Sequence, residues 1–475
     1  MENKLNPAEK WTEGYLAALF LLLPLLLHNG YFDVMETKTA CFLLLTALWL
    51  LGLFWLSALG RGLPGGSFPP GTVCALAFCA AGILAALLGG HGPGALLAAD
   101  NRYQGILIYL LYGGMAAALG RCGMGRVSLA ALLLGFGLNA LLGVLNFLGA
   151  DPLGLLTKLV AFDRGRFLGF IGNINFFGAY MTLLTPVAAV LFCRAEKPWP
   201  RLGLGLLSAL GLWGSMAARS ESAVLGFGAA VVLLPFALDE GALRRSVWLP
   251  GAAVTCMLAF ALLSAREFSA LTELMLRPVV GIALILLGAA AYALALRSRR
   301  AYGLLLLGGL LALGLLLLLT NLRPAAVPAA LEPYLVLDAD FGSDRGAVWQ
   351  SCLRMYEELP WWQKLLGAGS GALARWDMLH RVFPDAVVDS AHNEYLHYLL
   401  THGALGLGAY LGWVFLALRR AFRSPSALYR ALGLGAAAYA VQAAVNIAQS
   451  ATTPLFFGVL ALLAGGAPLD SKDAL

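Results

Sequence analysis

The chain has 475 residues, of which 60% are hydrophobic and only 12% are charged, and its formal net charge is +6. A soluble protein is usually about 45–50% apolar and about 25% charged, so this composition excludes a soluble enzyme, a disordered chain and a secreted disulfide scaffold. The 56 glycines suit membrane helices, in which small residues let backbones approach closely. The composition therefore predicts an all-α, polytopic membrane protein.

Apolar runs recur along most of the chain, and crossing about 30 Å of hydrocarbon takes roughly 20 helical residues. Backbone polar groups find no water in lipid, so each run should be a helix. We expect 12–14 spans, because the stretch 202–238 can be read as one helix or two. The candidate runs are 14–30, 37–59, 71–90, 104–120, 125–148, 172–193, 202–218, 221–238, 247–264, 278–297, 301–320, 394–418, 427–447 and 452–466.

The distribution of charge predicts the orientation. With the N-terminus in the cytoplasm, 18 of the 32 Lys and Arg residues fall on the cytoplasmic side and 14 fall outside. Six of those 14 lie in one long loop, to which the positive-inside rule does not apply. The acidic residues divide as 8 inside and 18 outside, and all six histidines lie at or toward the outer side. We therefore expect both termini in the cytoplasm and the chemistry on the outer face.

One long hydrophilic segment interrupts the apolar runs and divides the chain. Long loops of this kind are uncommon and are usually functional. Inside it, a helix is predicted over 344–359, ending before Pro360. The predicted regions are N-terminal transmembrane helices at 1–320, a large extracytoplasmic loop with short helices at 321–391, C-terminal transmembrane helices at 392–466 and a cytoplasmic tail at 467–475.

His392 is the most informative candidate in the chain. It is predicted to lie in the first turn of the helix that re-enters the membrane, with Asp389 or Ser390 as the N-cap. The positive end of a helix disfavours an imidazolium, which keeps a neutral imidazole available as a base near pH 7. The same helix start favours an anion. A polar interfacial histidine without a role fits the sequence equally well.

Arg219 and Glu221 form a second candidate, because they interrupt the otherwise uncharged stretch 202–238. An ionisable pair at or in a membrane is a functional hypothesis by default. The alternative is a tight hairpin tip whose charges simply face water.

A third candidate combines arginines with amides. Arg164 and Arg166 precede Asn173 and Asn175, which open the next apolar run. Two arginines and two amides before a helix start would suit a phosphate or a sugar. The alternative is an interfacial loop whose long side chains reach the headgroup region.

The long loop contains a fourth candidate and a glycine-rich turn. Arg345 and Trp349 lie one helical turn apart. This spacing fits a cation–π pair or an arginine directed at a diphosphate, and it fits an ordinary amphipathic helix as well. The turn at 367–371 has the sequence Gly-Ala-Gly-Ser-Gly. It lacks the Lys-Ser/Thr ending of a nucleotide-binding loop, so a flexible turn is predicted.

Metal sites are not predicted. Asp338, Asp340 and Asp344 lack the glycine and closing glutamate of a calcium loop. His397 has no cysteine or carboxylate at zinc-ligand spacing, and the seven cysteines form no metal or disulfide pattern. We therefore expect no metal and no other cofactor.

Taken together, these segments resemble the O-antigen ligase and polymerase superfamily, bacterial membrane glycosyltransferases that use lipid-linked glycans. The resemblance runs from about residue 99 to 465. Its motifs are Arg166 with Gly172–Ala179, similar to a Gly-Asn-Pro-Asn segment with Ile174 where proline is usual; Ala218–Ala223, similar to a Ser-Arg-Gly segment; Arg345–Trp349 with Leu365–Gly369, similar to the loop helix and its exit; and Ala391–Leu396 with Thr401–Gly406, similar to a His-Asn-x-x-Leu segment and its continuation.

The resemblance implies a GT-C-like fold in the bacterial cytoplasmic membrane, with no cofactor and no nucleic-acid partner. It implies an O-antigen ligase-like transfer from undecaprenyl diphosphate to a hydroxyl of a glycan, lipid or protein acceptor on the outer face. In that activity Arg219 and Arg345 would hold the diphosphate and His392 would serve the acceptor hydroxyl. Arg166 is assigned to donor binding, and the residues assigned to donor or acceptor positioning are Asn173, Asn175, Asn393 and Trp349.

The chemistry of such a transfer predicts inversion at the sugar C1. When the diphosphate leaves, the negative charge that grows on it must be stabilised. The guanidinium of an arginine binds two phosphate oxygens at once. A hydroxyl that attacks from the opposite face needs a base, for which His392 is the best placed.

Two other functions remain open. A polymerase that joins lipid-linked repeat units of a surface polysaccharide would use the same donor chemistry, and these motifs do not separate it from a ligase. A transporter or flippase would place coupling charges and broken helices near the membrane midplane, often in inverted repeats. Here the ionisable residues gather at the outer ends and in one loop, which favours an enzyme.

Overall fold

The computed structural model describes residues 6–90, 92–98, 102–328, 331–384 and 386–465. The predicted tail at 467–475 lies outside the described residues. In the described part, the chain is almost entirely helical, and its strands are the two-residue β1 (Phe167–Leu168) and β2 (Gly172–Asn173). These strands pair antiparallel, with Phe167 opposite Asn173.

Every one of the predicted apolar runs is a helix, and 202–238 is divided into two helices at Ala218–Ser220. Within the described ranges, seven helices (α2, α3, α5, α6, α12, α13 and α18) are long and apolar enough to cross a membrane, by length and composition. The helices in the apolar runs are α1 (Pro7–Leu25), α2 (Val34–Ala58), α3 (Pro70–Leu88), α4 (Ile106–Leu119), α5 (Arg126–Leu148), α6 (Ile174–Arg194), α7 (Pro198–Ala217), α8 (Glu221–Ala237), α10 (Leu249–Ser264), α12 (Pro278–Arg297), α13 (Arg299–Leu322), α18 (Glu394–Arg423), α19 (Ala427–Gln442) and α20 (Thr453–Ala464).

Short helices connect these elements. They are α9 (Glu240–Arg245), α11 (Ala270–Leu276) and the 3₁₀ segments η1 (Gly92–Leu96), η3 (Arg164–Arg166), η4 (Pro324–Ala326) and η5 (Ala443–Val445). The chain is thus an all-α polytopic membrane protein, as its composition predicts.

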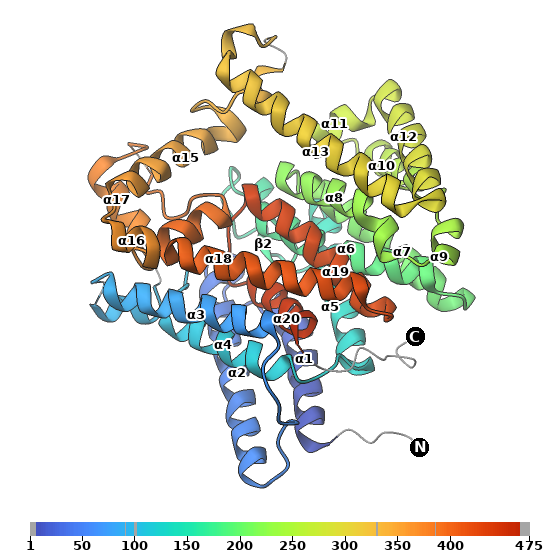
Figure 1. Cartoon of the computed structure of the whole chain (residues 1–475). Coiled ribbons are helices and arrows are strands. Elements are labelled where there is room, and N and C mark those ends of the chain that lie inside the picture. The colour runs from blue at the N-terminus through green and yellow to red at the C-terminus, as the bar shows by residue number, and fades with distance from the viewer. Residues whose placement is uncertain (1–5, 91, 99–101, 329–330, 385, 466–475) are drawn as a thin grey trace.

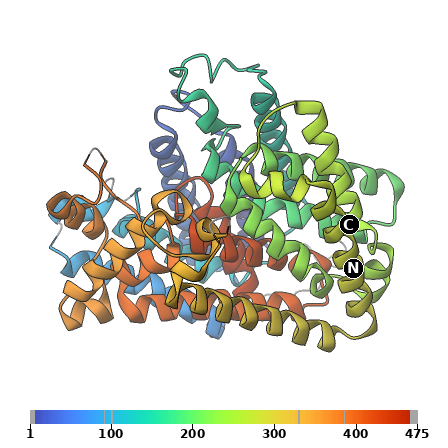
Figure 2. The ribbon, with the colours of Figure 1, turned by 90° about the horizontal axis from the view of Figure 1, so that it is seen from above.

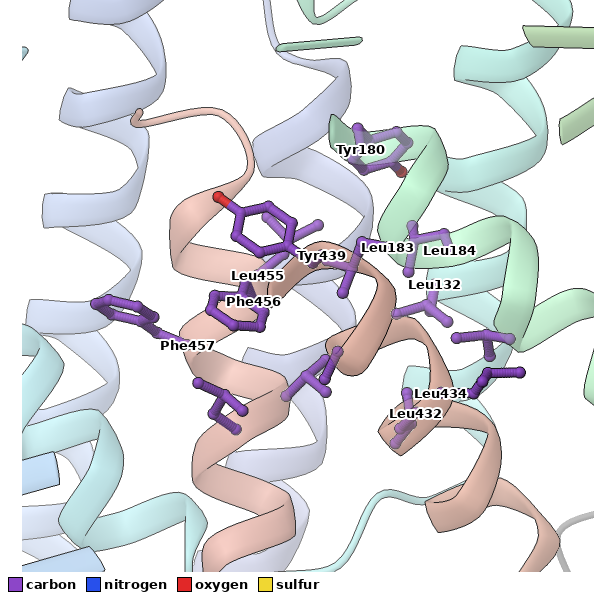
Figure 3. Packing of buried hydrophobic residues seen from close by; sticks show 14 of the residues in the cluster. Leu132, Tyr180, Leu183, Leu184, Leu432, Leu434, Tyr439, Leu455, Phe456 and Phe457 are labelled. Atoms are coloured by element: carbon purple, nitrogen blue, oxygen red, sulfur yellow. The ribbon is translucent and has the colours of Figure 1, made fainter. Parts of the chain in front are cut away.

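The core lies where α6, α19 and α20 meet (Figure 3). Tyr439 of α19 stacks on Phe456 of α20, with ring centroids 4.1 Å apart, and α6 is buried along most of its length. By contrast, α10, α12 and α13 form an outer group at the right of Figure 1. In α13 only Tyr302 is buried, because a helix that is apolar on every side can face lipid all round.

The hydrophilic segment between α13 and α18 folds over one end of the bundle. It is drawn in orange, mainly at the left of Figure 1 and at the left of Figure 2. It contains α14 (Glu332–Leu335), α15 (Phe341–Glu358), α16 (Trp361–Leu366) and α17 (Ala372–His380). Regular helical geometry in α15 starts at Arg345, because residues 342–344 are left-handed. A small apolar core, which includes Val348, Cys352 and Leu373, holds this segment together.

Helix α18 is broken at Gly403, whose φ of 70° and ψ of −178° suit glycine alone. The glycine-rich turn fills the break: the Ala368 and Gly369 amides donate to the carbonyls of Leu400 and Thr401 at 2.8 and 3.1 Å. The prediction of a flexible turn is therefore wrong. The turn supplies the donors that the interrupted helix lacks, and it fixes the loop against α18.

Gly403→Ala is expected to destabilise the protein by about 1–3 kcal/mol, because alanine is strained in this backbone conformation. A Cβ there would also meet the Leu365 carbonyl. Thermal unfolding of the purified protein in detergent measures the effect. Gly408→Ala is the matched control in the same helix, since nothing lies within 4 Å of its added Cβ. Equal melting temperatures for the two variants would contradict the assigned role of the break.

Candidate functional site

A cavity of about 450 Å³ opens where the long loop meets the ends of the membrane helices. It brings together elements that are far apart in the sequence: the start of α6, the α7–α8 turn, α15 and the segment before α18. Its lining residues are Asn175, Arg219, Ser220, Glu221, Ser343, Asp344, Arg345, Val348, Phe383 and His392. Four of the residues singled out in the sequence for binding or catalysis, Asn175, Arg219, Arg345 and His392, therefore share one cavity.

Arg219 is exposed in the tight turn between α7 and α8. Its backbone is left-handed, with φ of 49°, and its Nη2 donates to the Gly165 carbonyl at 2.6 Å. This bond ties the guanidinium to the loop before β1 and uses one of its five N–H donors. No other hydrogen bond of this guanidinium is formed within the described part of the chain, so its remaining donors can contact an anion in the cavity.

Asn175 supports the same turn from α6. Its Oδ1 accepts a hydrogen bond from the Ser220 hydroxyl at 2.8 Å, and Ser220 also pairs with Ser222 at 2.9 Å. Asn173 has a different role, because its side chain accepts from the Asn175 amide and caps α6. The Asn-x-Asn pattern thus divides into one helix cap and one cavity residue.

Arg345 enters the cavity from the first regular turn of α15. Its Nη1 donates to the Gly342 carbonyl at 2.6 Å, whereas its Nε is buried and has no hydrogen-bond partner among the described residues. Burial lowers the pKa of Arg345, and the neighbouring Glu221 carboxylate opposes that shift. A guanidinium stays charged in proteins, so a buried donor without a partner favours an anionic ligand here.

His392 lies just before α18 and not in its first turn. The N-cap is Asn393, whose Oδ1 accepts from the Leu396 amide at 3.0 Å. The predictions of Asp389 or Ser390 as N-cap and of His392 in the first turn are therefore wrong, because Asp389 is engaged elsewhere. His392 itself is left-handed, with φ of 49°.

The imidazole of His392 is nevertheless held neutral. The pKa of His392 is lowered to about 4, first by burial and then by the charges of Arg345 and Arg102, while Asp389 opposes the shift. The imidazole is therefore neutral mainly because it is removed from water and lies near two guanidinium groups, and not because of the helix end. At pH 7 the ring is an acceptor for a proton.

An ion pair beside His392 was not predicted from the sequence. Arg102 Nη2 lies 2.8 Å from Asp389 Oδ1 and ties the segment after η1 to the segment before α18. These partners are 287 residues apart, and no local pattern links them. The one available signal was the acidic Asp389, three residues before His392.

Two of the other residues singled out in the sequence lie outside the cavity lining. Arg166 has a side chain that is 55% exposed and lies 3.7 Å from Asp163 and 4.0 Å from the Phe162 ring centroid. Trp349 packs against Phe341 with centroids 5.6 Å apart, and the described residues show no cation–π contact between Trp349 and Arg345. The cavity instead includes Phe383, which carried no sequence signal.

Backbone strain is concentrated around this cavity. Arg219, Ser343, Asp344 and His392 all have positive φ, between 49° and 66°. Each non-glycine residue in this region costs about 1–3 kcal/mol, and such residues cluster at functional sites, where surrounding structure holds them in place. The strain therefore supports a functional cavity.

The charges in the lining balance. Two guanidinium groups, from Arg219 and Arg345, face two carboxylates, from Glu221 and Asp344. The first pair can bind phosphate oxygens, and the second pair can accept hydrogen bonds from hydroxyl groups. Among the described residues, no group of three or more His, Cys, Asp or Glu side chains could hold a metal ion. The lining therefore suits a ligand with both an anionic and a polyhydroxyl part.

These features define a membrane protein with a cavity, lined by two arginines and a histidine, where the long loop meets the ends of its helices. Residues 274–411 match the family model for O-antigen ligase, which confirms the resemblance over that segment. No curated protein matches the chain. The matched segment includes Arg345 and His392, whereas Asn175 and Arg219 lie before it. The match supports a membrane enzyme of the general O-antigen ligase or polymerase type.

Proposed function

We propose that this protein transfers a glycan from undecaprenyl diphosphate to an acceptor hydroxyl, as an O-antigen ligase does. The observation that carries the proposal is the shared cavity: Arg219, Arg345 and His392 come from three distant elements and line one 450 Å³ space. We place the cavity on the outer face of the bacterial cytoplasmic membrane, with both termini in the cytoplasm, because the Lys and Arg residues favour that orientation.

In the proposed reaction the acceptor oxygen attacks the sugar C1 while the C1–O bond to the diphosphate breaks. The hydroxyl proton passes to the neutral His392 ring, and the electron pair of the broken bond leaves with undecaprenyl diphosphate. Arg219 and Arg345 stabilise the charge that grows on the leaving group. Glu221 and Asp344 accept hydrogen bonds from sugar hydroxyls. Attack opposite the leaving group inverts the configuration at C1.

Binding of the donor also prepares the base. Arg345 and Arg102 lower the pKa of His392, and a bound diphosphate neutralises positive charge beside it. The pKa of His392 then rises toward neutrality, where a general base works best.

The pH dependence of kcat/KM should report the free enzyme. The base must be deprotonated, and the pKa of His392 is about 4, so we expect kcat/KM to be flat from pH 7 to about 5 and to fall only near pH 4. Arg345→Gln removes a positive charge, which raises this pKa and moves the acid limb to higher pH. Initial rates at low donor concentration measure both profiles. An acid limb near pH 6.5 in the native protein, or no movement in the variant, would contradict the assignment.

The function itself is tested by incubating the purified protein with a labelled undecaprenyl-diphosphate glycan and candidate acceptors, and then weighing the products. Ligase activity places the glycan on an acceptor that is not the lipid carrier. Polymerase activity gives a ladder of products on the carrier. Movement of the donor across liposomes without a new glycosidic bond would contradict the proposal and favour a transporter.

A further inference from the structure

Two cavities outside the candidate site lie beside α12. The first has a volume of about 200 Å³ and lies between α6, α7, α8, α10 and α12. Its lining is predominantly apolar and includes Phe192, Leu212, Leu234 and Ala253. The second is about 250 Å³ in volume and lies between α9 and the α12–α13 turn, beside Arg297 and Arg299.

The position of both cavities follows from the direction of α12. Its N-terminal end adjoins α11, where the Leu271 amide donates to Glu221 of the candidate site at 3.4 Å. Its C-terminal end is Arg297. The polar cavity is therefore at the far membrane face, separated from the candidate site by the length of α12. The apolar cavity extends from there into the middle of the bundle, where Leu212 of α7 and Phe227 of α8 line it.

Helix α12 lines both cavities. On α12, Tyr292 lines the apolar cavity and Ala295 lines the polar one, a separation of about 4.5 Å along the helix. On the other wall, Leu243 of α9 lines the polar cavity, and Trp248, the N-cap residue of α10, lines the apolar one. A single molecule with a polar end and an apolar end can therefore occupy both.

The apolar cavity is suited to hydrocarbon. The hydroxyls of Tyr292 and Ser208 donate to main-chain carbonyls at 3.0 and 2.7 Å, so neither of them calls for a polar ligand. The Thr185 hydroxyl is the one buried side-chain polar atom of this lining without a partner among the described residues. Apolar cavities of about 150 Å³ stay free of water and accept small apolar molecules. Trp248, which is 50% exposed, places the mouth of the cavity at the surface of the membrane domain, where lipid chains are available.

The polar cavity is suited to an anion. Arg297 and Arg299 line it, and Arg297 forms no ion pair among the described residues. Arg299 donates to the Leu238 carbonyl at 2.6 Å. The one carboxylate in the lining, Glu240, is already paired with Arg244 at 2.5 Å. Basic pockets between membrane helices bind anionic headgroups.

From this arrangement we propose a binding site for an anionic phospholipid of the bilayer. The phosphate headgroup lies beside Arg297 and Arg299, and part of one acyl chain fills the apolar cavity between α7, α8, α10 and α12. The lipid then joins the outer group of helices to the core of the bundle. This inference does not depend on the proposed transferase activity.

The test is native mass spectrometry of the full chain in detergent, with equal amounts of phosphatidylglycerol and phosphatidylcholine. We expect one retained phosphatidylglycerol per protein. Arg297→Gln should weaken its retention about fivefold, the contribution of one basic group near an anionic headgroup, and Arg297→Lys should largely preserve it. Arg300→Gln is the matched control, because Arg300 is exposed at the start of the same helix as Arg299 and outside the lining.

A second pair of variants tests the acyl-chain site. Ala253→Leu fills the apolar cavity and should reduce retention of the bound lipid, whereas Leu286→Phe on the exposed face of α12 should not. Ala209→Leu fills the same cavity from α7 and replaces Ala253→Leu if that variant fails to fold. The proposal is overturned by equal retention of the two lipids, by equal effects of the Arg297 and Arg300 variants, by no effect of cavity filling, or by displacement with undecaprenyl phosphate.

Discussion

Replacing His392 with alanine is expected to lower kcat by roughly 10²–10⁴, which is the contribution of a positioned general base. Folding should be preserved, because the His392 side chain is only half-buried and makes no hydrogen bond among the described residues. The loss should appear in single-turnover rates with saturating donor. Membrane insertion and thermal unfolding should match those of the native protein.

Two controls make this result specific. His380→Ala removes an exposed histidine from α17 in the same loop and should leave transfer close to normal. Glu221→Gln removes one of the two carboxylates in the cavity that can accept a proton, and we expect a smaller loss than for His392→Ala. Near-normal transfer by His392→Ala, combined with a large loss in Glu221→Gln, would move the base to Glu221.

Replacing Arg345 with alanine is the second change with a large expected effect. Removing one preorganised donor to a developing negative charge typically costs about 10²–10³ in kcat. Arg345→Lys should recover only part of the rate, because lysine keeps the charge and loses the paired N–H donors. Initial rates over a range of donor concentrations separate kcat from KM, and the transition-state role predicts that kcat changes more.

Arg354→Ala is the matched control for this prediction. Arg354 lies on the same helix α15, is exposed and does not line the cavity, so its removal should leave kcat unchanged. A loss confined to KM in Arg345→Ala would indicate ordinary donor binding. Equal losses for the two arginines would indicate a general effect of charge on the loop.

The helices of this chain were predictable because their apolar runs are nearly uninterrupted, and the structure places a helix in each of those runs. The break in α18 was not predictable, because Gly403 lies within an apolar run and glycine is common in membrane helices. Its partner is the Gly367–Gly369 turn of the preceding loop, and a contact of this kind leaves no periodic pattern in the sequence.

The candidate site was predictable in its residue types but not in its assembly. Arg219, Arg345 and His392 attracted attention as charges or polar groups next to apolar runs, and all three line the cavity. Arg166 fits the same pattern but pairs with Asp163 outside the lining. Sequence spacing cannot separate these cases, because the arrangement depends on how the long loop folds onto α6 and the α7–α8 turn.

Tertiary structure, and not a local sequence pattern, also explains why His392 is neutral. The sequence suggested the end of a helix, whereas burial and the charges of Arg345 and Arg102 lower the pKa of His392. Asp389, a candidate cap in the sequence, is used in the ion pair with Arg102, and Asn393 caps the helix in its place. Asp389 thus forms a long-range ion pair with Arg102 and does not cap the helix that follows it.

The most direct test of the proposed mechanism is the anomeric configuration of the product, measured by NMR on glycan transferred by the purified protein from a donor of known configuration. A single displacement assisted by His392, with undecaprenyl diphosphate leaving from the opposite face, predicts an inverted linkage and one released undecaprenyl diphosphate per bond formed. A retained linkage would contradict the account.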